Sequence, residues 1–360
     1  MILEIYGCEY HYLSILRKEG FLNWLFASVL EKLSSMCLRI FPGSLTLSSL
    51  SSSKVNCLYY LKSKKRLDRK YDLVLGYSSA YFPAQLFSKK TGAPFCFDME
   101  DYHPWEKGYN CDKDSHRTKI EKQLIEILPE CVYVSFASPL IERQTTLLFR
   151  KYEATLPKSF VVNNTFSSTE FDLQESDEAK IGFVWFSQTV SFGRGLEQIL
   201  PVLEKHKDKT ALTIIGNLDN EFKRHVLERS SADISLKEAM PQKELHHEIG
   251  RYDIGLALEI PQDACDNRSI CLTNKIFAYF LSGLWILATD TPAQREFIDR
   301  HRGHGALSAL DPVSLTAQIE YIIENASDIR SQKAQRFHAA KHACWENEKN
   351  LLLDAWSNVR

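Results

Sequence analysis

The sequence predicts an α/β protein built from two doubly wound domains, each around a parallel sheet. Its 360 residues exceed one ordinary domain and suit two domains of roughly 150 to 180 residues each. Apolar strand-like runs alternate with helix-like runs, a pattern typical of crossover units in a parallel sheet. A polar, acidic segment at 167–179 interrupts the alternation, which then restarts. We therefore expect two βα arrays that face each other across a cleft.

The composition is that of a globular protein, with 44% hydrophobic and 25% charged residues. The nine cysteines are odd in number and never in CxxC spacing, which indicates small buried residues in a reducing cytosol rather than disulfides or a zinc site. No secretory signal is visible at the N-terminus. The most apolar segment, FLNWLFASVL at 21–30, is shorter than the roughly 20 residues of a membrane span. We expect no segment that crosses a bilayer.

The first predicted domain, residues 1–166, opens with one or two amphipathic helices over 11–40 and a serine-rich loop. Strands are then expected at 71–79, 94–100, 132–138 and 159–166. The helices between them are expected at 81–92, stopped by Gly92, at 114–130 and at 139–151. Residues 167–179 form the predicted linker.

Residues 1–90 are basic, with 13 Lys and Arg against 6 Asp and Glu, a difference of +7. Much of this charge follows two tyrosines in YYLKSKKRLDRKYD, at Lys62, Lys64, Lys65, Arg66, Arg69 and Lys70. A solvated loop explains the stretch without any partner. Basic residues beside aromatics also favour an anionic membrane surface or nucleic acid, but no nucleic-acid-binding motif accompanies them. We expect no nucleic acid partner.

The second predicted domain, residues 180–325, repeats the alternation. Strands are expected at 180–187, 210–217, near Ile234 and at 253–260, with helices at 193–206, 220–230, 242–252 and 292–301. A further helix and strand lie within 272–292. The tail, residues 326–360, has one long helical pattern with no strand after it, and we expect it to pack back on the first domain.

A turn with two glycines joins a strand to a helix in VWFSQTVSFGRGLE, residues 184–197. The free amides and the dipole at such a helix start favour a phosphate, and Arg194 adds a permanent, multidentate cation. The alternative is that Gly193 and Gly195 only shape the turn. The carboxyl ends of strands in such sheets are also where ligands bind.

A second helix start of this kind lies in LTNKIFAYFLSGLWILATDTP, residues 272–292. Thr273 is expected to cap the helix, with Asn274 and Lys275 in its first turn. An unpaired lysine there opposes the helix dipole, which prefers an acid, so an anionic ligand would resolve the conflict. A lysine that simply faces solvent is the alternative. Two phosphate-seeking helix ends in one domain suit a diphosphate.

With these motifs in order, the second half resembles the retaining glycosyltransferases of the GT-B fold (glycosyl transferases group 1) that build lipopolysaccharide, capsule and exopolysaccharide. The matching pieces are FVWFSQTVSFGRGLEQIL, LTIIGN, LKEAMPQKEL, TNKIFAYFLSGLWILATDTP with Glu296 after it, and WENEKNLLL. The resemblance covers about residues 70–360 and rests on the order and spacing of the motifs. It implies two Rossmann-like domains, with the tail helix crossing back to the first.

The resemblance also implies roles at matching positions. Arg194 and Lys275 would hold the diphosphate of a UDP- or GDP-linked sugar and stabilise the charge that develops as it leaves. The backbone at 187–189 would approach the phosphates or the sugar, and the turn around Met240 would border the nucleobase. The implied donor-binding residues are Ser187, Gln188, Thr189, Gly193, Arg194, Asn217, Met240, Asn274, Lys275 and Glu296.

In the first domain, FDMEDYHPWE stands where the family presents acidic and histidine residues beside the transferred sugar. The implied catalytic residues are His103 and Asp101, with Asp98 and Glu100 nearby. His103 would hydrogen-bond the sugar or the acceptor hydroxyl. The alternative for His103 is packing at a helix start or between the domains.

We expect no metal ion and no cofactor besides the substrate. A DxD pattern occurs at 112–114, where it is expected to cap the following helix. Two cationic clamps can replace a metal in neutralising a diphosphate. One departure from the family is Ala278, where the family usually has an acid that grips the ribose; a lost charged hydrogen bond costs about 1.5 to 3 kcal/mol. Thr273 also replaces the usual proline.

The sequence thus favours a glycosyltransferase that moves a sugar to a saccharide or lipid-linked acceptor in surface polysaccharide synthesis, cytoplasmic and peripheral at the inner membrane face. The retaining mode rests on the resemblance alone. A catalytically silent binding or partner subunit is the alternative, which Ala278 permits. A sugar-nucleotide epimerase of the same fold is a third option, for which no acid/base constellation speaks.

Overall fold

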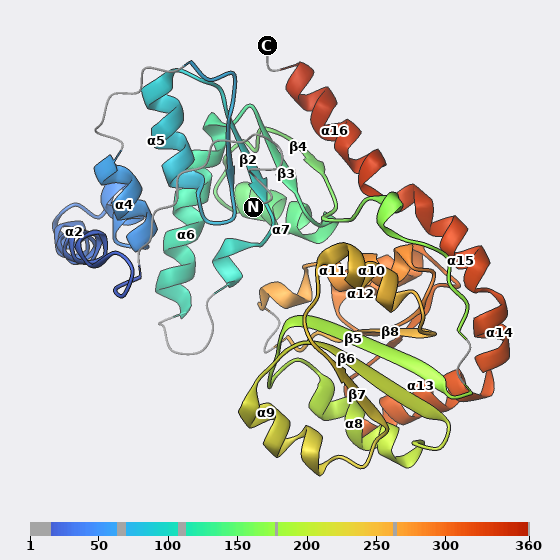
Figure 1. Ribbon diagram of the computed structural model, residues 1–360. Helices are drawn as coiled ribbons and strands as arrows, with labels where there is room; N and C mark the ends of the chain where they lie inside the picture. Colours follow the sequence, from blue (N-terminus) through green and yellow to red (C-terminus); the bar gives the residue numbers. More distant parts are fainter. Residues whose placement is uncertain (1–15, 63–69, 107–112, 177–178, 262–264, 359–360) are drawn as a thin grey trace.

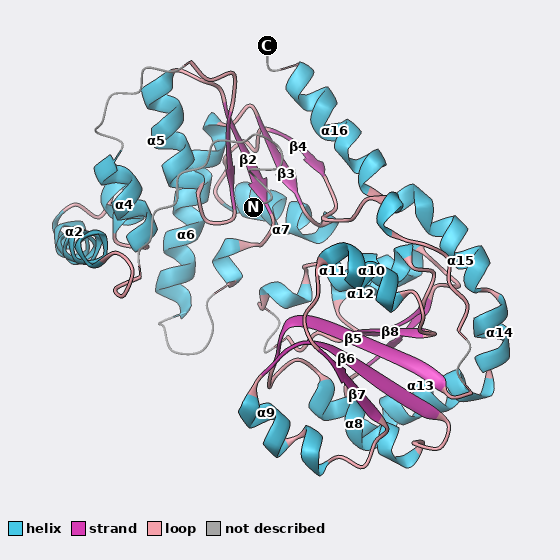
Figure 2. Cartoon of the chain, viewed as in Figure 1, coloured by secondary structure: helices cyan, strands magenta, loops and turns pink. Residues whose placement is uncertain are grey.

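The computed structural model describes residues 16–62, 70–106, 113–176, 179–261 and 265–358. These residues form two β-sheets, one of four strands and one of six, and helices pack around both (Figures 1 and 2). All strand pairs in both sheets are parallel. The α/β class predicted from the alternation of strands and helices is therefore confirmed.

Among the described residues, three helices precede the first sheet: α2 (Phe21–Ile40), α3 (Leu45–Leu50) and α4 (Lys54–Lys62). They form a layer at the outer side of the first half, beyond α5 and α6 (Figure 1). Polar contacts attach the layer to the domain: Gln123 Nε2 donates to Ser48 Oγ at 2.9 Å, and Lys119 Nζ donates to Ser51 Oγ at 2.7 Å. Of the basic stretch at 62–70, residues 63–69 lie outside the described part of the chain.

The first sheet has the order β1-β2-β3-β4, which follows the chain. Its strands are β1 (Val74–Tyr77), β2 (Phe95–Met99), β3 (Tyr133–Phe136) and β4 (Lys158–Val161). The helices between them are α5 (Tyr81–Thr91), α6 (Lys113–Ile127) and α7 (Pro139–Lys151). The expected stop at Gly92 is present, since this residue ends α5 with φ +74°. Each described strand is added on the same side of the one before it, so the described part of this sheet is singly wound, whereas a doubly wound sheet was expected.

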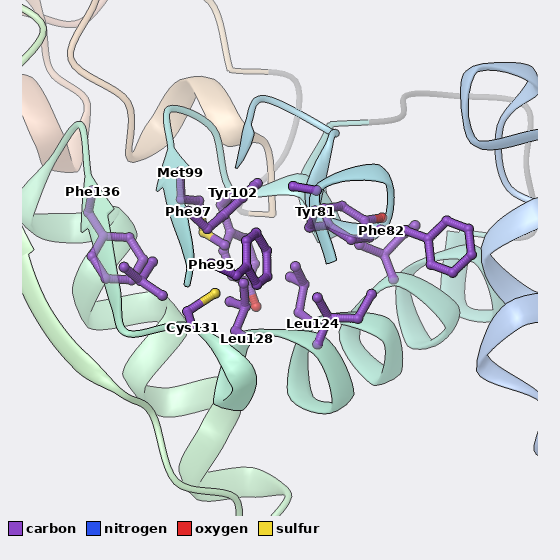
Figure 3. Packing of buried hydrophobic residues seen from close by; sticks show 14 of the residues in the cluster. Tyr81, Phe82, Phe95, Phe97, Met99, Tyr102, Leu124, Leu128, Cys131 and Phe136 are labelled. Atoms are coloured by element: carbon purple, nitrogen blue, oxygen red, sulfur yellow. The ribbon is translucent and has the colours of Figure 1, made fainter. Parts of the chain in front are cut away.

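Aromatic side chains dominate the core between this sheet and its helices (Figure 3). Phe97 lies at its centre, fully buried, with the ring of Tyr81 6.0 Å away in an edge-to-face arrangement. Burial of one such side chain stabilises the fold by about 1.5 to 3 kcal/mol. The labelled residues come from α5, β2, β3 and α6 and from the segments that follow β2 and α6, so one core holds all of these together.

The second sheet has the order β10-β9-β8-β5-β6-β7. Its strands are β5 (Ile181–Val190), β6 (Thr210–Leu218), β7 (Ile234–Lys237), β8 (Ile254–Ala257), β9 (Trp285–Thr289) and β10 (Gly305–Ser308). The helices between and after them are α8 (Leu196–Lys205), α9 (Asn220–His225), α10 (Gln242–Ile249), α11 (Asn274–Leu281), α12 (Pro292–Arg300) and α13 (Pro312–Glu324). The winding reverses between β5 and β8, which makes this junction the topological switch point.

The sequence prediction lacks β10 and α13, and also the helices α3 and α4. The expected serine-rich loop after residue 40 is wrong, because much of that stretch forms α3. The prediction for the tail is also wrong, because it forms α14 (Ala326–Ser331), α15 (Lys333–Ala340) and α16 (Trp345–Ser357) rather than one helix. The last break comes at Cys344, which is extended with ψ 162°. There Trp345 N donates to the carbonyl oxygen of Phe166 at 2.8 Å, so the chain turns toward the first sheet.

The helix α16 lies against the first sheet (Figure 1). Its Trp356 Nε1 donates to the hydroxyl of Tyr133 in β3 at 2.8 Å, and Ala355 is buried beside that ring. The carboxylate of Glu348 accepts from the backbone and side-chain nitrogens of Asn163 at 2.9 and 2.8 Å. In the second half, Arg336 Nε of α15 donates to the carbonyl oxygen of Gly283 at 3.0 Å, so the tail contacts both halves of the molecule.

Among the helices that the structure describes, none has both the length and the apolar character of a membrane span. No disulfide bond joins the cysteines of the described residues. The expected burial is confirmed for Cys57, Cys96, Cys131 and Cys344. It is wrong for Cys37 and Cys265, which are exposed.

Candidate functional site

The carboxyl end of β5 is irregular and carries three of the predicted residues. Pairing with β6 shifts register between Phe186 and Thr189, so Ser187 and Gln188 stand outside the regular ladder. Opposite them, Gly216 has φ +147°, and a Cβ there would lie 2.0 Å from the carbonyl oxygen of Ser187. Only glycine fits this approach, and the bulge turns backbone groups toward the edge of the sheet.

The turn into α8 has the two expected glycines. Gly195 is the N-cap with φ +90°, and its missing side chain lets the helix start approach Leu258. The backbone nitrogen of Gly193 donates to Glu197 Oε1 at 2.6 Å, so an acid of the first turn already occupies part of this helix end. Arg194 is half-buried and forms no ion pair with the described side chains.

The start of α11 differs from the prediction in two ways. Thr273 is the N-cap residue but makes no capping hydrogen bond, and its hydroxyl is buried without a partner among the described atoms. Lys275 is not unpaired: its Nζ lies 3.4 Å from Glu259 Oε1 and 5.7 Å from the ring centre of Trp185. Both charged side chains are largely buried, at 12% and 7% exposure. The partner of Lys275 is therefore the carboxylate of Glu259 in the same chain. The neighbouring Asn274 is exposed.

These two helix starts lie on the same edge of the second sheet. α8 follows β5, α11 follows β8, and the two strands are neighbours at the switch point. Gly195 would touch Leu258 if it carried a Cβ, and the next residue, Glu259, pairs with Lys275. Arg194 and Lys275 therefore flank one region at the carboxyl ends of β5 and β8.

A cavity of about 520 Å³ opens at the carboxyl ends of β5, β6 and β7. Val190, Leu236 and Ala239 line it together with Asn217 and the charged Lys237 and Glu238, so its wall is partly apolar and partly polar. Met240 follows directly, half-buried against the hydrophobic cluster behind the sheet. The structure thus brings the predicted Asn217 to one cavity with Ala239, the residue before Met240.

The loop after β2 contacts the loop after β8, so the carboxyl ends of the two sheets meet. Asp101 Oδ1 accepts from Asn267 Nδ2 at 2.5 Å and lies 3.3 Å from Cys271 Sγ. The backbone nitrogen of Tyr102 donates to Asn267 Oδ1 at 2.8 Å. Asp101 therefore joins the two halves rather than pointing freely into a site.

His103 begins a short 3₁₀ turn next to this contact. The side chain is 3% exposed, packed near the rings of Tyr81 and Phe97. Its Nδ1 lies 2.7 Å from Glu106 Oε2, which favours an N–H at Nδ1 and leaves Nε2 as an acceptor. Nε2 is buried and has no partner among the described atoms.

Two neighbouring carboxyl groups have raised pKa values. Burial raises the pKa of Asp98, against the hydrogen bond from Ser135. Burial, followed by the nearby charges of Asp98 and Asp101, raises the pKa of Glu100. Glu100 therefore lies near Asp98, Asp101 and His103, so acids gather at the end of β2.

Glu296 lies apart from the residues above. It forms ion pairs with Arg143 of α7 at 3.3 Å and with Arg300 at 3.0 Å. It also lines a smaller cavity of about 180 Å³ together with Phe277 and His301, between α7, α12 and the tail. No contact links it to Arg194 or Lys275 within the described residues.

Sequence reasoning missed Glu259 and Asn267. Glu259 has a signal, since an acid directly after the buried run of β8 stands at the ligand-binding edge of a parallel sheet. No local sequence signal marks Asn267, because its contacts are with Asp101 and Tyr102 in a loop of the other half. The described part of the chain contains no group of three or more His, Cys, Asp or Glu side chains placed to hold a metal ion. Of the DxD pattern, residue 112 lies outside that part, and α6 begins at Lys113.

No protein-family model matches the chain, and no curated protein matches it either. Solved structures match over most of its length. HepE from Anabaena in complex with UDP has a TM-score of 0.62 and 12% identity, covering 84% of this chain and 82% of its own. The E. coli trehalose-6-phosphate protein bound with UDP-2-fluoroglucose has a TM-score of 0.61 and 11% identity, covering 83% and 76%.

Sucrose-phosphate synthase from Thermosynechococcus elongatus matches with a TM-score of 0.60 and 12% identity, over 87% of this chain and 79% of its own. These neighbours are glycosyltransferases of the GT-B fold. The chain therefore has this fold, with two Rossmann-like domains, as the sequence predicts.

Proposed function

We propose that the protein is a glycosyltransferase that moves a sugar from a nucleotide-sugar to a saccharide or lipid-linked acceptor. The observation that carries the proposal is the position of two helix starts, each with a cation, at the switch point of the second sheet. Ligands of doubly wound sheets bind at this point. The fold supports it further, because HepE was solved with UDP-glucose and the E. coli protein with a UDP-sugar analogue.

In this proposal the nucleobase occupies the cavity at the ends of β5, β6 and β7, with Asn217 and Met240 at its border. The diphosphate lies between Arg194 and Lys275. An ammonium carries three N–H donors, so Glu259 orients Lys275 with one and leaves the others for phosphate oxygens. The guanidinium and ammonium stabilise the leaving diphosphate, and no metal takes part.

The backbone of Ser187, Gln188 and Thr189 binds the phosphates or the sugar, together with Gly193 and Asn274. His103 accepts a hydrogen bond at Nε2 from a hydroxyl of the sugar or the acceptor, which its lack of a partner supports. Asp101 fixes the loop that carries His103 by its contact with Asn267. A donor-binding role for Glu296 rests on the family resemblance alone, because its ion pairs with Arg143 and Arg300 hold it apart from Arg194 and Lys275.

Three finer parts of the proposal rest on the family resemblance: the retaining mode, the role in surface polysaccharide such as capsule or lipopolysaccharide, and the choice of UDP or GDP. A cytoplasmic position at the inner membrane face follows from the lipid-linked acceptor and from the basic residues of the first 90 positions. The alternative, a catalytically silent partner subunit, is permitted by Ala278, since α11 carries no acid along its whole length, Asn274–Leu281.

Thermal unfolding with UDP and with GDP tests the proposal. We expect one nucleotide to raise the Tm of the wild type, Arg194→Ala to abolish this shift, and a matching nucleotide-sugar to be hydrolysed slowly. The matched control is Arg302→Ala, because Arg302 is exposed in the turn between α12 and β10, at the opposite edge of the sheet. Absence of any shift with either nucleotide overturns the proposal; a shift without hydrolysis or transfer favours the partner subunit.

A further inference from the structure

The helix α2 has an arrangement opposite to that of an ordinary surface helix. Its small residues Ala27 and Ser34 are buried, on the side that packs on α3 and α4. Most of its large apolar residues face outward, although Leu30 packs on the core of the first half. Those on the outer face are 47% to 72% exposed, and they are Leu22, Phe26, Val29, Leu33, Met36 and Ile40.

These six residues are spaced four, three, four, three and four positions apart, so they form one continuous stripe along a helix of 20 residues. At a rise of about 1.5 Å per residue the helix is about 30 Å long. A surface helix normally turns charged and polar residues outward. An apolar stripe of this length on the outside marks a surface that another body covers.

Charge identifies the partner. Lys32 and Arg39 lie on one border of the stripe, both exposed. The single acid of α2, Glu31, lies on the opposite side of the helix and is 3.9 Å from Lys54. If two copies paired through their stripes, in either direction, the cations would meet no carboxylate of α2. An anionic lipid surface offers an apolar interior for the stripe and phosphates for both cations.

We propose that α2 lies in the interface of an anionic bilayer, with its stripe among the acyl chains and Lys32 and Arg39 at the headgroups. Helices that lie in the interface combine an apolar face with Lys and Arg at its border. The inference rests on the proposed membrane location of the acceptor and names the element that provides it.

Co-sedimentation of the full chain with vesicles tests the inference. We expect binding to vesicles of equal parts phosphatidylglycerol and phosphatidylcholine, and much weaker binding to phosphatidylcholine alone. Phe26→Ser with Leu33→Ser is expected to lower the partition coefficient at least about tenfold on the anionic vesicles. Lys32→Gln and Arg39→Gln each lower it about fivefold, and salt reduces the difference.

The matched control is Leu147→Ser, because Leu147 of α7 is as exposed as Leu33, at 50% against 51%. It should bind vesicles as the wild type does. Wild type that stays in the supernatant with anionic vesicles, or a Phe26→Ser, Leu33→Ser variant that still sediments fully, overturns the inference. So does light scattering that finds a vesicle-free dimer which this double variant dissociates.

The nucleotide response separates this test from the test of the proposed function. The double variant in α2 should keep the Tm shift with UDP or GDP in vesicle-free buffer, which also shows that it folds. A protein that binds vesicles but no nucleotide would overturn the transferase and leave the membrane helix standing. The reverse result would overturn only the membrane helix.

Discussion

Lys275→Met tests whether the ammonium at the start of α11 supports the fold as well as the proposed donor site. The change strands Glu259, a carboxylate with 7% of its side chain exposed. Removal of one partner from a buried ion pair costs about 3 to 5 kcal/mol. The low end applies, because the 3.4 Å contact is long and Lys275 is not fully enclosed. The lost contact with Trp185 adds about 0.5 to 1 kcal/mol, so the variant should lose about 3 to 4 kcal/mol.

Urea unfolding followed by tryptophan fluorescence measures this loss. Adding Glu259→Gln to Lys275→Met removes the stranded charge, so about 2 kcal/mol of stability should return. Lys243→Met is the matched control, since Lys243 is the second residue of α10 as Lys275 is of α11, but is exposed. It should change stability by less than about 0.5 kcal/mol. Equal stability of the Lys275 and Lys243 variants would refute the reasoning.

Three further predictions concern other parts of the fold. Burial raises the pKa of Glu121, but hydrogen bonds from Lys151 and Arg117 outweigh it and hold this pKa below 4.5. The stability that the carboxylate contributes above pH 4.5 is therefore lost as the pH falls below that value, and in Glu121→Gln the Tm should fall less steeply at acid pH. Burial and neighbouring histidines lower the pKa of His301 to about 4, so as the pH falls below 6.5 the unfolded chain takes up a proton at this position before the folded one does. The free energy of unfolding should therefore decline from pH 6.5 toward pH 4, and urea unfolding above and below pH 6.5 should show that His301→Phe removes this decline. Gly216→Ala should cost about 2 to 4 kcal/mol in thermal unfolding and weaken any nucleotide response, because φ is +147° and the new Cβ meets a carbonyl oxygen; an unchanged Tm would contradict the bulge geometry.

The sequence predicts most elements because local signals agree with the packing. The helix expected at 139–151 matches α7, where Ser138 accepts a hydrogen bond from Leu140 N and Pro139 opens the first turn. By contrast, β10 is the short run Gly305–Ser308, with too few apolar residues to stand out. The break before α16 has no local breaker. It arises from contacts with residues almost 180 positions away, as in the bond between Thr165 Oγ1 and the carbonyl oxygen of Ala343.

The candidate site shows the same division. Gly193 and Gly195 could be predicted, because a strand followed by a glycine turn and a helix is a local pattern. The partner of Lys275 could not, since Glu259 reaches it only when β8 and α11 are packed. The contact of Asp101 with Asn267 joins positions 166 residues apart, so it depends on how the two halves meet. Local sequence therefore predicts the helix starts, and tertiary packing decides which of their charges are free.

The tail gives the molecule a second connection between its halves. The chain passes once from β4 to β5 and returns once from α15 to α16. The two passages are bonded to each other, since Glu346 accepts from Ser168 N at 3.0 Å and from the hydroxyl of Ser167, and Glu348 accepts from Asn163. A single tether would let the halves twist and slide in any direction. Two crossing segments that are bonded to each other restrict the relative motion of the halves to rotation about one axis. Such a rotation can widen or narrow the space between the halves while the facing ends of the two sheets stay aligned.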